Sequence, residues 1–322
     1  MEEDYLTRPA QDTDHLPDLP PGGRRATPQR SASSITVLQK LGSMENILQT
    51  IKKSLADIYE SEEAAAIARE ISETCFHITP VQAYAGTGHP LNQQERERLD
   101  QILLRLHRYE PLQYIIGSAY FMGHRFRVAP GVLIPRPETE DLVEQAIHCF
   151  KDHEAPTLID AGTGSGCIAI ALKLALPRAR VTAIDCSDAA LQQAEVNARE
   201  LGAEVEFVKA DLLRPETLPR LQADAIISNP PYVRESERAE MEPRVKDFEP
   251  DLALFVPDCD ALRFYRALAA WGQQVLNDGG RIFAEINSAL PDETQRLFED
   301  DGYRTTLLHD RYFKKRMLIC QR

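Results

Sequence analysis

The feature that most constrains the fold of this chain is an alternation of short apolar runs with helical patterns over its second half. The β-branched or apolar runs that fit strands cover residues 157–159, 181–184, 205–208, 225–228 and 281–286, with two more near 304–308 and 315–320. Helical patterns fit between these runs at about 166–176, 188–200 and 260–276. Such alternation predicts an α/β domain with a mostly parallel, doubly wound sheet. We therefore expect a Rossmann-like sheet of seven strands with helices on both faces.

The N-terminal third of the chain predicts a different kind of structure. Residues 1–43 are rich in proline, glycine and serine and poor in aromatic side chains, so we expect them to be disordered. One hypothesis is that the working protein starts at Met44. From Met44 onward the apolar period is helical, with N-cap patterns at Ser61 and Asn92. This pattern predicts a small all-α domain over residues 44–111.

A β-hairpin is expected to link the all-α domain to the sheet. Residues 112–135 contain a turn at Met122-Gly123-His124, flanked by extended apolar runs that include residues 114–116. The α/β domain then covers residues 136–322 and opens with a helix at about 138–150.

Composition argues against several classes of function. The 322 residues carry a net charge of −13, which disfavours a broad phosphate-binding surface. The sequence shows no apolar run long enough to cross a membrane and no secretory leader, so we expect a cytoplasmic protein. The cysteines have no metal-ligand spacing and predict reduced thiols and no metal site. These six residues are Cys75, Cys149, Cys167, Cys186, Cys259 and Cys320.

The first candidate site is a glycine-rich loop, Asp-Ala-Gly-Thr-Gly-Ser-Gly at residues 160–166, between a predicted strand and a predicted helix. Glycines there let the backbone turn sharply and approach a ligand closely. A dinucleotide-binding loop would have a third glycine where this chain has Cys167, so NAD fits poorly. The pattern resembles the cofactor loop of S-adenosylmethionine (AdoMet) methyltransferases, while a loop for another nucleotide and a purely structural turn are the alternatives. The candidate cofactor-binding residues are Gly162, Thr163, Gly164, Ser165 and Gly166.

Two further acidic positions follow the next two predicted strands. Asp185 ends one strand, where a carboxylate can accept hydrogen bonds from both ribose hydroxyls of a nucleoside, at close to the expected spacing of about 20 residues. Asp211 and Leu212 follow the other strand, where methyltransferases often contact the adenine. For both aspartates the alternative is an ordinary loop or helix-capping residue.

The second candidate site is the sequence Asn229-Pro230-Pro231-Tyr232, which follows the predicted strand 225–228. Pro-Pro cannot continue a strand or a helix, so we expect a rigid loop at the edge of the sheet where ligands bind. The nitrogen of a planar NH₂ group is a weak nucleophile because its lone pair is delocalised. The Asn229 side-chain oxygen and the Pro230 carbonyl can hold its two N–H bonds and orient it toward a methyl group, and Tyr232 can stack on the flat group. The alternative is a proline-rich loop with a surface tyrosine.

Together these motifs resemble those of class I methyltransferases that act on planar nitrogens. The string Leu-Ile-Pro-Arg-Pro-Glu-Thr-Glu at residues 133–140, with Pro-Leu-Gln-Tyr-Ile-Ile-Gly at residues 111–117, narrows the likeness. It is similar to the peptide chain release factor glutamine methyltransferases of the HemK type. The resemblance covers residues 44–322.

The resemblance implies a reaction, a cofactor and a partner. The side-chain amide nitrogen of the glutamine in the Gly-Gly-Gln motif of class-1 release factors would be methylated with AdoMet. Asn229, Pro230 and Tyr232 would be catalytic, Asn229, Pro230, Pro231 and Tyr232 would hold the glutamine, and Asn229 would also border the cofactor. The all-α domain would recognise the release factor, and we expect a monomer with no direct nucleic-acid binding. The alternative is a DNA or RNA adenine or cytosine amino-methyltransferase, which would need a basic strand-binding surface.

Two groups of residues are open to more than one interpretation. Arg136, Glu138 and Thr139 are typical of a helix start but would also fit the mouth of a pocket. A basic cluster near the C-terminus is interpreted as a solvated strand edge, or else as a docking site for the partner. It consists of Arg311, Lys314, Lys315 and Arg316.

Overall fold

The computed structural model describes residues 46–85, 87 and 89–322, and Asn46–Arg322 form one compact unit. The prediction for residues 1–43 lies outside the described residues. Within the described part, no helix is long and apolar enough to cross a membrane.

The predicted helical domain is built from short amphipathic helices around one core. In α2, for example, Ile47, Leu48, Ile51 and Leu55 fall on one face and are buried. The Asn92 prediction is confirmed, because Asn92 and Glu95 form a reciprocal capping box at the start of α5. The Ser61 prediction is wrong by one position, since Glu60 is the N-cap and Ser61 is the first helical residue. The helices are α2 (Ile47–Leu55), α3 (Ser61–Phe76), α4 (Pro80–Ala85), α5 (Gln93–Leu106) and α6 (Leu112–Ile116).

The hairpin is shorter than the sequence suggests. Its strands are β1 (Ser118–Phe121) and β2 (His124–Arg127), which pair antiparallel. Met122 and Gly123 both have positive φ, as a two-residue turn needs in order to match the twist of its strands. Residues 114–116 belong to helix α6 and are not extended, because Leu112, Ile115 and Ile116 pack against the core of the helical domain.

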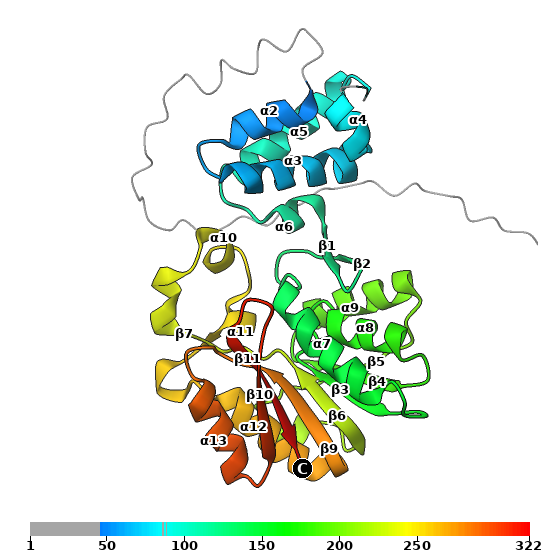
Figure 1. The fold of residues 1–322 in the computed structure, drawn as a ribbon, viewed down its shortest axis with the longest axis vertical. Coiled ribbons are helices and arrows are strands. Elements are labelled where there is room, and N and C mark those ends of the chain that lie inside the picture. Colours follow the sequence, from blue (N-terminus) through cyan, green and yellow to red (C-terminus); the bar gives the residue numbers. More distant parts are fainter. Residues whose placement is uncertain (1–45, 86, 88) are drawn as a thin grey trace, which may run out of the picture. The chain divides into compact units, whose positions relative to one another are not determined.

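The predicted sheet of seven mostly parallel strands is confirmed (Figure 1). Its order is β10-β11-β9-β6-β3-β4-β5, and β11 alone runs opposite to the other strands of this sheet. Strands β3 and β6 are neighbours although two strands separate them in the chain, so the strand order changes direction between them. In such sheets ligands bind at this point, at the carboxyl ends of the strands. The strands are β3 (Thr157–Ala161), β4 (Arg180–Asp185), β5 (Glu206–Lys209), β6 (Ala223–Ser228), β9 (Leu276–Glu285), β10 (Arg304–His309) and β11 (Lys315–Gln321).

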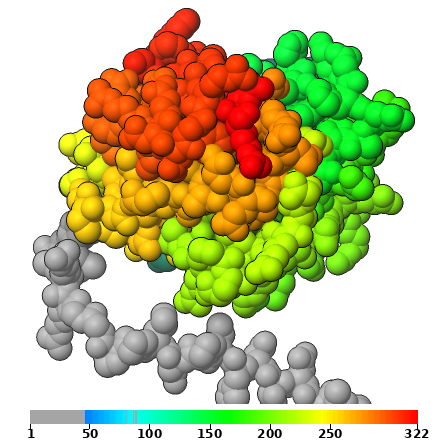
Figure 2. Space-filling model, turned by 90° about the horizontal axis from the view of Figure 1, so that it is seen from below, coloured from blue at the N-terminus to red at the C-terminus, as the bar shows by residue number. Residues whose placement is uncertain are grey.

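Helices cover both faces of the sheet and form two separate cores. Helices α7 (Pro137–Phe150), α8 (Cys167–Ala175) and α9 (Asp188–Leu201) lie on one face, and α12 (Arg263–Val275) and α13 (Pro291–Asp300) lie on the other (Figure 1). Helix α13 is a finding of the structure that the sequence pattern did not predict. Figure 2 shows the red end of the chain on the surface, beside the orange segments that precede it in the sequence.

The segment between β6 and α12 consists of short elements and contributes to the site. It follows directly on the Asn-Pro-Pro-Tyr sequence and includes a two-stranded parallel pair, β7 (Val233–Arg234) with β8 (Phe255–Val256). The helical turns here are η3 (Glu235–Glu240), α10 (Pro243–Lys246), α11 (Asp251–Leu254) and η4 (Asp258–Asp260), and one more turn, η2 (Pro215–Thr217), precedes β6.

Candidate active site

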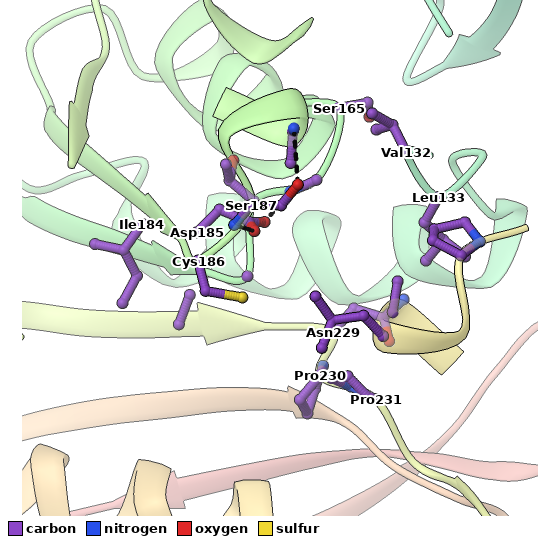
Figure 3. Close-up of a pocket in the computed structure, with 18 of the residues that line it drawn as sticks. Val132, Leu133, Ser165, Ile184, Asp185, Cys186, Ser187, Asn229, Pro230 and Pro231 are labelled. Carbon is purple, nitrogen blue, oxygen red and sulfur yellow. Dashed lines mark hydrogen bonds between the residues drawn. The ribbon is translucent and has the colours of Figure 1, made fainter. Parts of the chain in front are cut away.

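A cavity lies at the carboxyl ends of β3, β4 and β6, where the strand order changes direction. Figure 3 shows Asp185 and Ser187 on one side of it, Asn229, Pro230 and Pro231 on the opposite side, and Val132 and Leu133 on a third. The two motifs singled out in the sequence therefore face one another across one space. The cavity is lined by segments 131–136, 161–165, 184–187, 210–213 and 229–231, together with Thr139, Cys167, Ile168, Ala190, Pro250, Leu252, Ala253 and Phe264.

The glycine loop forms the cavity wall after β3. Gly162, Gly164 and Gly166 all have positive φ, which side-chain-bearing residues rarely adopt. At Gly166 an added Cβ would also lie 2.9 Å from the Cβ of Ala194 on α9, so no larger residue fits without a shift. The backbone N–H groups of Gly162 and Thr163 donate to the Ile184 carbonyl at 2.9 Å each, which ties the loop to the end of β4.

Asp185 holds this loop from the neighbouring strand. Its Oδ2 accepts a hydrogen bond from Gly164 N, and its Oδ1 accepts one from Ser187 N, both at 2.9 Å (Figure 3). Burial raises the pKa of the Asp185 carboxyl, while these backbone N–H groups act in the opposite direction. Each carboxylate oxygen keeps a lone pair for a ligand. Asp211 and Leu212 also line the cavity, as expected from their place after β5.

Asp160 lies behind the glycine loop and is fully buried. Its Oδ2 accepts from Thr163 Oγ1 at 2.6 Å and from Ala169 N at 3.0 Å, while its Oδ1 has no partner among the described residues. Burial raises the pKa of Asp160 to about 7. A buried carboxylate oxygen without a donor favours a ligand that brings a positive charge or a hydrogen-bond donor to this loop.

The opposite wall is the Asn-Pro-Pro segment after β6. Ser228 Oγ donates to the Ala161 carbonyl at 2.7 Å and so holds the ends of β6 and β3 together. Asn229 Nδ2 donates to Thr139 Oγ1 at 3.0 Å, and Thr139 Oγ1 donates to Glu285 Oε2 at 2.7 Å. Among the described residues nothing donates to the Asn229 side-chain oxygen, and Asn229 lines the cavity with Pro230 and Pro231. This oxygen is the acceptor that a substrate N–H requires.

Tyr232 lies beneath this wall and is not among the residues that line the cavity. Its hydroxyl donates to Glu285 Oε1 at 2.8 Å and accepts from Arg316 at 3.3 Å. Burial raises the pKa of the Tyr232 phenol above its usual value. The sequence predicts that the Tyr232 ring stacks on the substrate, but here the ring packs against the core below the sheet edge. In this position Tyr232 supports the Asn-Pro-Pro segment from beneath.

Both interpretations of the helix-start residues hold in part. Pro137 is in the first turn of α7, and Arg136 and Thr139 line the cavity, but Glu138 does not. The Arg136 guanidinium pairs with the buried Glu249 at 2.6 Å. Glu249 also accepts from Ile134 N at 3.2 Å, so it fixes the wall that precedes α7.

The basic cluster is more than a solvated strand edge. Arg316 pairs with the buried carboxylate of Asp310 at 2.9 Å and reaches the Tyr232 hydroxyl. Arg311 pairs with Asp141 of α7 at 2.6 Å. Lys315 is exposed and lies 3.4 Å from Asp292.

The sequence analysis did not identify the two glutamates that support the second wall of the cavity, which is the wall after β6. Glu249 and Glu285 are 5% and 1% exposed, although charged residues are rarely buried without partners. The signal was present for Glu285, which is a charge at the end of an otherwise apolar run in β9. Glu249 lies between short elements that have no regular apolar pattern, so its charge does not stand out in the sequence as a buried one.

The fold and the two walls define an AdoMet-dependent methyltransferase. A Methyltransferase small domain model matches residues 143–244, and a PrmC N-terminal domain model matches residues 46–117. A release factor glutamine methyltransferase from Bacteroides thetaiotaomicron is 44% identical over 280 residues, covering 87% of this chain and 100% of the relative. Another from Flavobacterium psychrophilum is 37% identical over 279 residues, covering 85% and 98%. The chain belongs to the family of release factor glutamine methyltransferases.

Observations on the cavity itself fit AdoMet. Gly162 and Gly164 leave room beside the backbone, and Asp185 offers two acceptors. Behind the loop, Asp160 Oδ1 has no donor among the described residues. Apolar residues complete the space on the side of Ile184 and Leu212. A nucleoside with a cationic amino acid end matches this set of groups.

Proposed function

We propose that this protein methylates the side-chain amide nitrogen of the glutamine in the Gly-Gly-Gln motif of class-1 peptide chain release factors. The observation that carries the proposal is the free side-chain oxygen of Asn229, which faces the same cavity as the glycine loop. Relatives that match 87% and 85% of this chain are named release factor glutamine methyltransferases.

The wall after β3 and β4 would hold AdoMet. Gly162, Thr163, Gly164 and Ser165 line the cavity and would border the cofactor. Gly166 does not line it, and we propose that it completes this loop from behind, where it packs against Ala194. Asp185 would accept from the ribose hydroxyls, and Asp211 and Leu212 would border the adenine. Asp160 would face the positively charged amino acid end, since it is the carboxylate behind the loop. When bound, AdoMet supplies a methyl group already activated by the positive charge on sulfur.

The wall after β6 would hold the substrate amide. The Asn229 side-chain oxygen and the Pro230 carbonyl would accept the two amide N–H bonds, and this fixes where the nitrogen points. Pro230 and Pro231 restrict the backbone, so both acceptors are held in place before the substrate arrives. Transfer would form a bond between the amide nitrogen and the methyl group as the sulfur–methyl bond of AdoMet breaks, which would leave the sulfur as a neutral thioether. The nitrogen would lose one proton to solvent, so no strong base is required in the cavity.

We also infer how the protein works with its partner. Residues 44–111 would recognise the release factor, because the acceptors of Asn229 and Pro230 alone would take any glutamine that reached them. Residues 112–135 would link this domain to the methyltransferase domain at 136–322. The net charge of −13 supports a protein substrate over a nucleic acid. We propose a monomer that acts in the cytoplasm.

The test is methyl transfer from tritiated AdoMet to a purified class-1 release factor, followed by mapping of the labelled residue by mass spectrometry. The matched control is the same factor with the glutamine of its Gly-Gly-Gln motif changed to alanine. We expect label on the side chain of that glutamine and none on the control factor. Transfer to DNA or RNA in parallel reactions, without transfer to the release factor, would overturn the proposal.

A further inference from the structure

We propose that Thr139 and Glu285 are positioning residues, which fix the side-chain amide of Asn229 with its oxygen toward the substrate. The inference rests on the proposed role of Asn229 and adds the two groups that determine which way its amide faces. Neither group needs to touch the substrate's reacting nitrogen.

The direction of each hydrogen bond follows from the chemistry of the groups. A carboxylate only accepts, so the single hydroxyl proton of Thr139 is donated to Glu285 Oε2, at 2.7 Å. The Thr139 oxygen can then only accept from its other neighbour, Asn229, which must present its NH₂ group, at 3.0 Å. The amide oxygen of Asn229 therefore points away from Thr139 and remains an acceptor.

The hydrogen bonds from Asn229 to Thr139 and from Thr139 to Glu285 form a chain that we call the relay, and residues of several elements hold it in place. Thr139 on α7 and Glu285 at the end of β9 are 2% and 1% exposed, so water does not compete for their hydrogen bonds. The other carboxylate oxygen of Glu285 is occupied by the Tyr232 hydroxyl, and its backbone carbonyl accepts from the Tyr265 hydroxyl at 3.1 Å. The Glu285 side chain thus cannot turn away from Thr139 without losing its hydrogen bond from the Tyr232 hydroxyl.

The orientation matters because the two faces of an amide have opposite polarity. With the oxygen toward the cavity, Asn229 accepts a substrate N–H. With the amide turned over, two N–H groups would meet the substrate's own N–H groups, and neither set would have an acceptor. A neutral asparagine has no charge to select between these states, so the selection must come from Thr139 and Glu285.

The first arm of the test removes the relay at Thr139 in the full-length enzyme. Thr139→Val keeps the shape of the side chain and deletes the hydroxyl, and we expect kcat to fall by about tenfold or more while the Kd for AdoMet stays within about twofold. Thr139→Ser keeps the hydroxyl and should retain most of the activity. Thr182→Val is the matched control, because Thr182 does not line the cavity and donates to Glu206 on the neighbouring strand β5 at 3.1 Å. A Thr139→Val enzyme with wild-type kcat would overturn the proposal.

The second arm asks whether Thr139 acts through Asn229. Single-turnover transfer from tritiated AdoMet is measured for Thr139→Val, Asn229→Ala and the double variant. If Thr139 only positions Asn229, its substitution should change the rate of the Asn229→Ala enzyme by less than about twofold. Equal fold losses in both backgrounds would show a direct or structural role and sink the relay. Failure of the proposed function is distinguishable, because the wild-type enzyme would then label no release factor at all.

Discussion

The two walls of the cavity are built by different means. The wall after β3 is made of backbone, with three glycines at positive φ and N–H groups tied to the Ile184 carbonyl and to Asp185. The wall after β6 is oriented by side chains, because Asn229 depends on Thr139 and Glu285, and Tyr232 depends on Glu285 and Arg316. One wall is therefore local in sequence, and the other is assembled from α7, β9 and β11.

This difference matches what each wall has to do. A cofactor is the same molecule in every turnover, and a rigid backbone loop recognises it through shape and a few fixed acceptors. A methyl acceptor must be aimed as well as bound, and the side-chain oxygen of Asn229 has a direction that its neighbours can set. Changes in the first wall should then mainly affect AdoMet binding, and changes in the second should mainly affect kcat.

The largest effect is expected for Asn229→Ala. Loss of the oriented acceptor should lower kcat for the release factor by about 100- to 1000-fold, comparable to other lost positioning hydrogen bonds. The Kd for AdoMet, measured by calorimetry, should change only a few-fold, because the first wall stays intact. Asn277→Ala is the control, since Asn277 bonds to Asp224 at 2.7 Å away from the cavity. A variant that binds AdoMet poorly but turns over normally at saturation would contradict the division between the walls.

Asp185→Asn should show the opposite pattern. One of the two carboxylate oxygens becomes an NH₂ group, which cannot accept from Gly164 N, Ser187 N or a ribose hydroxyl. We expect the Kd for AdoMet to rise by about 10- to 100-fold, with kcat at saturating AdoMet within about threefold of wild type. The nearby Asp188→Asn is the matched control, because Asp188 pairs on the surface with Lys209. Similar binding by both variants would remove Asp185 from the cofactor site.

The same contrast explains how much was predictable from the sequence. The cofactor wall was found because glycine spacing, the strand before it and the acid after β4 are all local patterns. The seven strands were found for the same reason. The support of the second wall was not found, since Glu285 lies 146 residues from Thr139 and only the sheet order brings them together. Tyr232 was placed in the site by its neighbours in sequence, but the pairing with Glu285 and Arg316 draws it beneath the loop.

Asp160→Asn tests the buried charge behind the first wall. Burial raises the pKa of Asp160 from its usual value of 3.8 to about 7. Hydrogen bonds from Thr163 and Ala169 lower this pKa, and the negative charge of Asp185 raises it further. Between about pH 4 and 7 the folded chain therefore keeps a proton that the unfolded chain has lost, and the free energy of unfolding contributed by this group falls as pH rises.

The asparagine of the Asp160→Asn variant does not titrate, so its thermal unfolding without AdoMet should depend less on pH than that of the wild type. We expect a Tm about 2–4 °C above wild type at pH 8. The gain should vanish near pH 4, and AdoMet should stabilise the variant less than wild type. A wild-type Tm that rises between pH 5 and 8 relative to the variant would show that Asp160 is not the buried acid described.

The smallest effect is expected for Tyr232→Phe, and it separates two roles for the ring. If Tyr232 stacks on the substrate, phenylalanine keeps the flat surface and kcat stays unchanged. If its hydroxyl supports Glu285, the change leaves Glu285 Oε1 without its donor, while Arg316 keeps only its pairing with Asp310. The carboxylate that orients Thr139 is then held less firmly. We expect kcat to fall by about three- to tenfold with the KM for the release factor unchanged. Tyr303→Phe is the control, because Tyr303 donates its hydroxyl proton to the Ala269 carbonyl at 2.8 Å and does not line the cavity. This variant should lose stability without losing kcat per folded enzyme. Both variants remove one hydrogen-bonded hydroxyl, so a loss of kcat in Tyr232→Phe alone would be specific to the site. Such a result would show that the second wall depends on the hydrogen bonds among its side chains and not on the Asn-Pro-Pro backbone alone.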